Sequence, residues 1–109
     1  YYNKASGSLS SVTGGRYNEA PRDYSSVSGG DTNTASGYIS SVSGGRENEA
    51  TGQAASVSGG SKNTAQGERS TVSGGSDSIA SAFASAITGG FENKADGNYT
   101  AITGGTSNT

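Results

Sequence analysis

Small and apolar side chains recur along this chain at fixed positions of a 15-residue unit. Gly-Gly pairs begin at a constant spacing of 15 residues with no insertion, and from Asn3 to Ser107 the chain reads as seven units of NxASGxxSSVSGGxx. Counted from the Asn, position 3 is Ala in every unit and position 10 is Val or Ile. A pattern of this kind predicts a repeat architecture, in which each unit is one structural layer.

Within each unit the small or apolar residues lie two apart, which is the period of a β-strand. We place positions 1, 3 and 5 inward on a first strand, positions 8, 10 and 12 inward on a second, and turns at positions 6–7 and 13–15. The fold class is therefore all-β, a parallel β-solenoid (β-roll) of seven 15-residue two-strand coils. Stacking at ~4.8 Å per coil gives a rod roughly 34 Å long. The predicted inner core is Ala5, Val12, Ala20, Val27, Ala35, Val42, Ala50, Val57, Ala65, Val72, Ala80, Ile87, Ala95 and Ile102.

Glycine is expected at the corners, because a reversing coil needs positive φ or close approach of two backbones there. Asn at position 1 suits the exit from such a turn, and stacked Asn side chains can form hydrogen bonds between coils. The regular Gly-Gly pairs and the many Ser and β-branched residues disfavour a helix. The predicted structural turn residues are Gly14, Gly15, Gly29, Gly30, Gly44, Gly45, Gly59, Gly60, Gly74, Gly75, Gly89, Gly90, Gly104 and Gly105.

The predicted core is thin, with one Ala and one Val or Ile as the main apolar filling of each coil. Hydrogen bonds between coils must therefore supply much of the stability, and a second buried face would add to it. Identical neighbours supply such a face most simply, so we expect an oligomer. Position 7 is apolar in six of seven units and is either a subunit contact or a cover for the turn; it holds Leu9, Tyr24, Ile39, Ala54, Arg69, Ala84 and Tyr99.

Composition argues against catalysis, a metal site and a bound cofactor. The 109 residues include neither Cys nor His, so the commonest general base and metal ligand is missing and the many Ser have no His partner. The GGxGxD calcium motif is not matched, because no third Gly follows the Gly-Gly pairs. Seven Lys and Arg against nine Asp and Glu give no nucleic-acid footprint, and no apolar run is long enough to span a membrane. Mixed charges at the turns, such as Arg16 and Asp31, predict solubilising ion pairs between coils.

Positions 9 and 11 face outward on the second strand and are nearly all Ser or Thr, which predicts a regular grid of hydroxyl groups. Two interpretations remain open: a flat face that binds an ice lattice, or ordinary solvated strand positions. Ice-binding faces favour Thr, whereas this grid is mostly Ser. The candidate ligand ladder at position 11 is Thr13, Ser28, Ser43, Ser58, Ser73, Thr88 and Thr103.

Two units depart from the consensus. In the second unit, Pro21 removes a backbone donor from the first strand, and Arg22 replaces an inward Gly and must turn outward. In the sixth unit, Ser78 replaces Asn, and the only two phenylalanines, Phe83 and Phe91, predict an exposed patch or an interface.

The paired A-x-G and V-x-G motifs resemble the head repeats of YadA-like trimeric autotransporter adhesins, and the resemblance covers essentially the whole chain. The unit here is one residue longer than that family's usual coil, at the Gly-Gly turn. The resemblance implies a left-handed β-roll, a homotrimer, an extracellular or cell-surface location, and attachment to host matrix, a cell surface or another solid surface. Similar repeats occur in phage-type tail fibres, so a purely structural filament is an alternative. We expect residues 1–109 to form a single β-roll repeat domain, as a segment of a longer protein.

Overall fold

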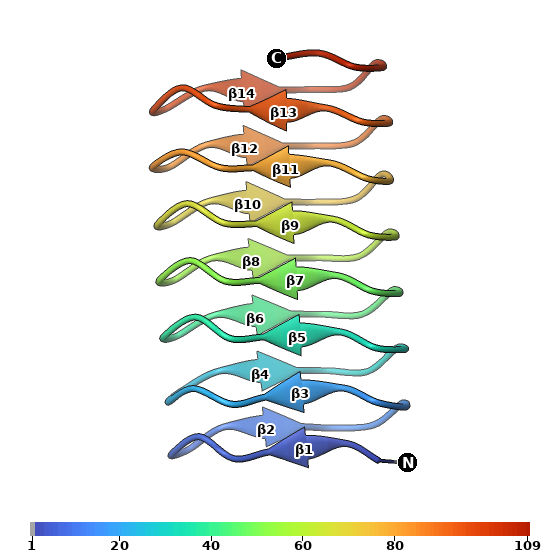
Figure 1. Ribbon diagram of the computed structural model, residues 1–109, viewed down its shortest axis with the longest axis vertical. Coiled ribbons are helices and arrows are strands. Elements are labelled where there is room, and N and C mark those ends of the chain that lie inside the picture. The colour runs from blue at the N-terminus through green and yellow to red at the C-terminus, as the bar shows by residue number, and fades with distance from the viewer. Residues whose placement is uncertain (1) are drawn as a thin grey trace.

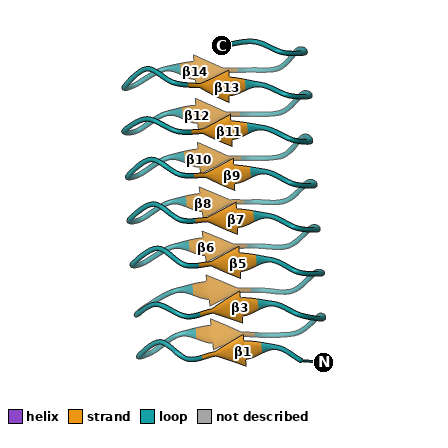
Figure 2. Cartoon of the chain, viewed as in Figure 1, coloured by secondary structure: helices purple, strands orange, loops and turns teal. Residues whose placement is uncertain are grey.

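The computed structural model describes residues 2–109, which form one stack of seven coils without a helix (Figure 1). Each coil has two strands of two residues joined by turns, and loops make up the rest (Figure 2). The first strands of the coils are β1 (Lys4–Ala5), β3 (Glu19–Ala20), β5 (Thr34–Ala35), β7 (Glu49–Ala50), β9 (Thr64–Ala65), β11 (Ile79–Ala80) and β13 (Lys94–Ala95). The second strands are β2 (Ser11–Val12), β4 (Ser26–Val27), β6 (Ser41–Val42), β8 (Ser56–Val57), β10 (Thr71–Val72), β12 (Ala86–Ile87) and β14 (Ala101–Ile102).

The strands form two parallel seven-stranded sheets. The odd-numbered strands make one sheet and the even-numbered strands make the other, each in chain order, so that Val42 pairs with Val57 in the next coil. As the chain rises in Figure 1, the front strands run to the left and the rear strands to the right, which is a left-handed coil. The molecule measures 35 × 21 × 11 Å, in agreement with the length predicted for seven stacked coils. The predicted parallel β-solenoid of 15-residue coils is confirmed.

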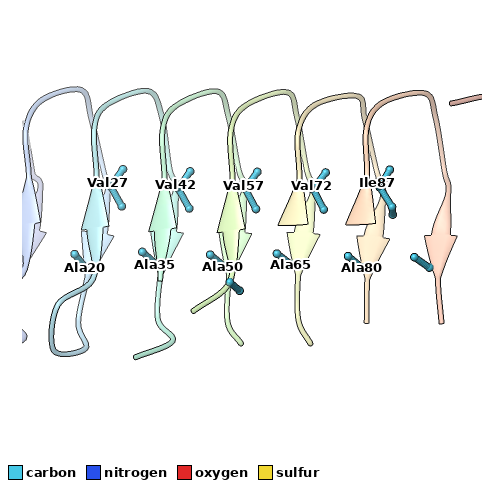
Figure 3. Packing of buried hydrophobic residues seen from close by; sticks show 12 residues of the cluster. Ala20, Val27, Ala35, Val42, Ala50, Val57, Ala65, Val72, Ala80 and Ile87 are labelled. Atoms are coloured by element: carbon cyan, nitrogen blue, oxygen red, sulfur yellow. The ribbon is translucent and has the colours of Figure 1, made fainter. Parts of the chain in front are cut away.

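Between the two sheets lies a core of two parallel rows, one of alanines and one of valines with Ile87 (Figure 3). The inner coils bury these side chains almost completely, and Ala55 joins them. The end coils differ from the expected core: Ala5 is exposed, and Val12 and Ile102 are only partly buried. Each of these three side chains belongs to a coil that has a neighbour on one side only.

The two glycines of each Gly-Gly pair have different roles. The second has φ between 84 and 101°, and in the inner coils a Cβ there would collide with a carbonyl oxygen of the next coil. The first has no positive φ, and a Cβ there would meet nothing closer than ordinary contact. The first glycine lies in the bend of every unit, as predicted, but neither its φ nor the space around it requires glycine there. Our prediction that position 12 points inward is wrong, because a Cβ there would point into open space; the position 12 residues are Gly14, Gly29, Gly44, Gly59, Gly74, Gly89 and Gly104.

Two corners of each coil are formed by residues other than glycine that have positive φ. Positions 7 and 15 of the units have φ between 53 and 60°, including the β-branched Ile39 and Thr32. This left-handed conformation reverses the direction in which the backbone N–H group points. Strand amides donate to the following coil, as Ser41 does to Ala55 O at 3.0 Å, whereas Ile39 N donates to Asp23 O of the preceding coil at 3.1 Å. The corners thus add hydrogen bonds between coils, which offset the strain of the conformation.

Beyond the two strands, each coil contributes to a third parallel row. Single-residue bridges at position 14 connect Arg16, Asp31, Arg46, Ser61, Ser76, Phe91 and Thr106. We expected a plain turn at this position.

The second coil is irregular, as predicted. Elsewhere position 4 donates its N–H to the next coil, as Ser36 does to Ala50 O at 3.0 Å, but Pro21 has no N–H to donate. The pairing of β3 with β5 is reduced to Glu19 and Thr34, and Arg22 is exposed.

Candidate binding surface

The outward side chains of the even-numbered sheet form a surface that we call the hydroxyl face. It comprises positions 9 and 11 of every unit, and all its members are Ser, Thr or Ala. Position 11 is exposed in every coil, whereas position 9 is half-buried between its neighbours in the inner coils. The predicted ladder from Thr13 to Thr103 therefore lies along one surface. The position 9 residues are Ser11, Ser26, Ser41, Ser56, Thr71, Ala86 and Ala101.

The backbone under the hydroxyl face is held in register from coil to coil. Ser43 N donates to Val57 O at 2.9 Å, and Ser58 N donates to Val72 O at 2.9 Å. The same bond recurs from Thr13 to Thr88. Successive hydroxyl groups are therefore carried on a regular, rigid support at the ~4.8 Å spacing of the coils.

The outward face of the odd-numbered sheet has a different character. It carries Lys4, Glu19, Glu49 and Lys94 at position 2, and Lys94 Nζ lies 3.6 Å from Asp96 Oδ1. The hydroxyl face, by contrast, carries none of the seven Lys and Arg and none of the nine Asp and Glu. The solenoid therefore has one charged face and one uncharged face.

Ion pairing at the Gly-Gly edge is less extensive than the sequence suggested. Arg16 Nη2 lies 2.7 Å from Asp31 Oδ2 in the next coil. The hydrogen bond from Arg16, and a further one from Thr32, hold the pKa of the Asp31 carboxyl below its ordinary value. Arg46 pairs with the adjacent Glu47 at 3.3 Å, so this pair does not connect two coils. Among residues 2–109, Arg16 and Asp31 form the only salt bridge between coils at this edge.

The opposite edge, at positions 6 and 7, combines aromatic and aliphatic side chains with the charged Asp23, Glu68 and Arg69. Tyr24 and Tyr38 meet edge to face with ring centroids 5.8 Å apart, and Phe83 and Tyr99 do so at 5.4 Å. Position 7 residues such as Tyr99 are largely exposed. Phe91 lies on the Gly-Gly edge instead, so the two phenylalanines do not form the single patch that we expected.

The buried polar side chains form a continuous network. Asn48 Nδ2 donates to Gly44 O at 2.9 Å and to Gly60 O at 3.0 Å, while its Oδ1 accepts from Asn63 N at 2.9 Å. The predicted bonds between stacked Asn residues therefore run from side chain to backbone. At position 8, Ser40 Oγ donates to Gly37 O at 2.6 Å, and the same bond recurs in other coils. Within the described part of the chain no buried side-chain polar atom lacks a partner, so this network is explained by structure alone.

The described residues enclose no pocket, and they contain no cluster of three or more acidic side chains that would suit a metal ion. The candidate binding surfaces are therefore the flat faces and the edges.

From residue 2 to residue 109 no helix has the length and apolar character needed to cross a membrane.

The sequence matches no protein-family model and no curated protein.

Proposed function

We propose that this chain is part of an extracellular fibre or adhesin, in which it is a non-catalytic, stiff spacer with a repetitive surface. The observation that carries the proposal is the unbroken stack of seven coils in one register, 35 Å long. A rod of this kind presents the same shallow surface many times, so that weak contacts add up by avidity.

The resemblance to YadA-like head repeats supports this reading, and we extend the proposal to self-association as a homotrimer or filament and to a host matrix or cell surface as the partner. The left-handed coil agrees with the roll that the resemblance implies. The half-exposed Tyr24 and the strongly exposed Leu9 and Tyr99 on one edge support contact with another macromolecule, because exposed apolar patches often mark interaction sites.

Beads coated with the chain test the adhesive role. We expect their retention under flow on immobilised collagen or on a cell monolayer to rise steeply with the surface density of the chain, as avidity requires. Beads coated with an unfolded, urea-treated sample are the control. If retention on both surfaces equals that of the control at every density, the chain is a structural shaft without adhesive function.

A second candidate, ice binding, is favoured by one specific observation: the hydroxyl face is uncharged and regular over all seven coils. Thermal hysteresis measured at millimolar concentration tests it. An ice-binding chain depresses the freezing point below the melting point, and replacement of the half-buried Thr71 by Lys abolishes the difference. No hysteresis in the unmodified chain rules this function out.

A further inference from the structure

We propose that the hydroxyl face is where a second copy of this chain packs. This inference rests on the self-association contained in the proposed function, and it assigns the contact to one of the four sides of the solenoid. It places the contact elsewhere than at position 7, for which a subunit contact was one of two open interpretations.

The available area separates the faces from the edges. A stable protein interface buries roughly 600–1,000 Å² on each partner. The side of the molecule that bears a sheet face measures 35 × 21 Å with its turns included, roughly 700 Å², whereas an edge measures 35 × 11 Å, roughly 400 Å². An edge is therefore too narrow to hold two copies together alone, even where it carries exposed rings such as Tyr24 and Tyr99. Only a face is large enough.

Charge separates the two faces. On the odd-numbered sheet, a second copy would have to cover Lys4, Glu19, Glu49 and Lys94, three of which have no salt bridge within the described chain. Removing unpaired charges from water costs several kcal/mol each. Positions 9 and 11 of the hydroxyl face carry no charge, so association through them avoids this cost.

The chemistry of the hydroxyl face suits a copy of itself. A Ser or Thr hydroxyl both donates and accepts, so two such groups can satisfy one another across an interface. The side chains are short and their support is regular, which allows two sheets to approach to the ~10 Å separation of packed sheets.

One coil provides a matched pair of variants. Thr64 in β9 and Thr71 in β10 are the same residue type, both half-buried and outward-facing, on opposite faces. We expect the unmodified chain to sediment as a multi-chain species and Thr71→Lys to weaken association at least ~100-fold, because it places an unpaired charge in the contact. Thr64→Lys should associate like the unmodified chain. Far-ultraviolet circular dichroism establishes that each variant is folded.

A milder pair of variants covers the case in which Thr71→Lys does not fold. The chain has no cysteine, so Ser58→Cys on the hydroxyl face and Thr51→Cys on the charged face each introduce a single thiol. Both positions are exposed in the single chain and belong to the same coil. Under conditions of association, a maleimide reagent should react at least ~10-fold more slowly with Cys at position 58 than at position 51, and dilution should remove the difference, because the contact dissociates by mass action.

The outcomes are distinct. Association that survives Thr71→Lys, with equal thiol reactivity at both positions, overturns the hydroxyl face as the contact but leaves self-association intact. A folded monomer at high concentration overturns both. A monomer that inhibits ice growth through Thr71 identifies ice, and not a second copy, as the occupant of the face. Retention of coated beads is measured separately, so a failed interface does not decide the adhesive role.

Discussion

Each buried Asn joins three backbone groups, and this role requires an amide. Asn48→Asp keeps the shape but cannot donate to Gly44 O and Gly60 O, and it places a carboxylate beside both carbonyl oxygens. Because Asn48 is fully buried, we expect a loss of at least about 3 kcal/mol in the free energy of unfolding. Urea denaturation measures this loss.

Asn98 provides the control for this substitution. It is exposed at a turn, and its Oδ1 accepts from Phe83 N at 3.2 Å, which a carboxylate also does. Asn98→Asp should therefore change the stability by less than about 0.5 kcal/mol. Equal losses at Asn48 and Asn98 would contradict the assigned role of the buried amides.

The Arg16–Asp31 pair makes stability depend on pH in acid. The pKa of Asp31 is lowered in the folded chain, chiefly by the hydrogen bond from Arg16. The folded state therefore holds its proton less tightly than the unfolded state. The contribution of this pair to the free energy of unfolding is fully present above the ordinary pKa of Asp. It is lost as the pH falls through the lowered pKa of Asp31. We expect Asp31→Asn to remove this part of the acid sensitivity, as measured by melting temperature between pH 7 and pH 2, with Asp77→Asn as a control. Unchanged acid sensitivity in Asp31→Asn would contradict the pairing.

The corner turns are strained where they use residues that disfavour positive φ. Ile39 has φ of 58° and is half-exposed, so its side chain gains little from burial. Asn adopts this conformation at lower cost, and Ile39→Asn should raise the free energy of unfolding by about 1 kcal/mol. Ile79→Asn is the control, because Ile79 lies in β11 without positive φ and is better buried. The control should be neutral or destabilising; a similar loss in both variants would show that the corner is not strained.

The conformation of these corners could not be predicted from the sequence, although most of the fold could. The stack of coils and its register follow from the two-residue period and the constant 15-residue spacing, and they are confirmed. The inward positions 1, 3, 8 and 10 are buried in the inner coils as predicted, whereas position 12, which we also placed inward, points into open space. The positive φ at position 7 could not be predicted, because Leu, Tyr, Ile, Ala and Arg occupy it and none of them marks a left-handed turn. The partners of the buried Asn side chains were equally hidden, since they are backbone atoms brought close only by the stacking of coils.

One face of the solenoid is charged and the other is uncharged, and the two-residue strand period explains this difference only in part. Strand alternation predicts which positions point outward, and the sequence then shows that one outward set is uncharged. The sequence does not give the size of each side. A side with a sheet face is 21 Å wide and an edge is 11 Å wide, and this difference favours a face over an edge for self-association. The exposed Tyr and Leu side chains of position 7, for which a subunit contact was one of two open interpretations, lie on the narrower side.

The complete stack should tolerate the removal of one whole unit and no other length. Deletion of residues 48–62 brings Asn63 directly after Glu47, so that every later residue keeps its position and the rod shortens by ~4.8 Å. Deletion of residues 48–61 instead places Lys62 at the buried position 1 and moves Val72 from the core to the outward position 11, which buries a charge and exposes an apolar side chain. Since each coil contacts only its neighbours, the first variant should fold with a proportionately lower stability. Small-angle X-ray scattering and circular dichroism should show a shorter folded rod for the first variant and loss of the continuous solenoid for the second. Equal folding of the two variants would mean that the 15-residue register does not determine the structure.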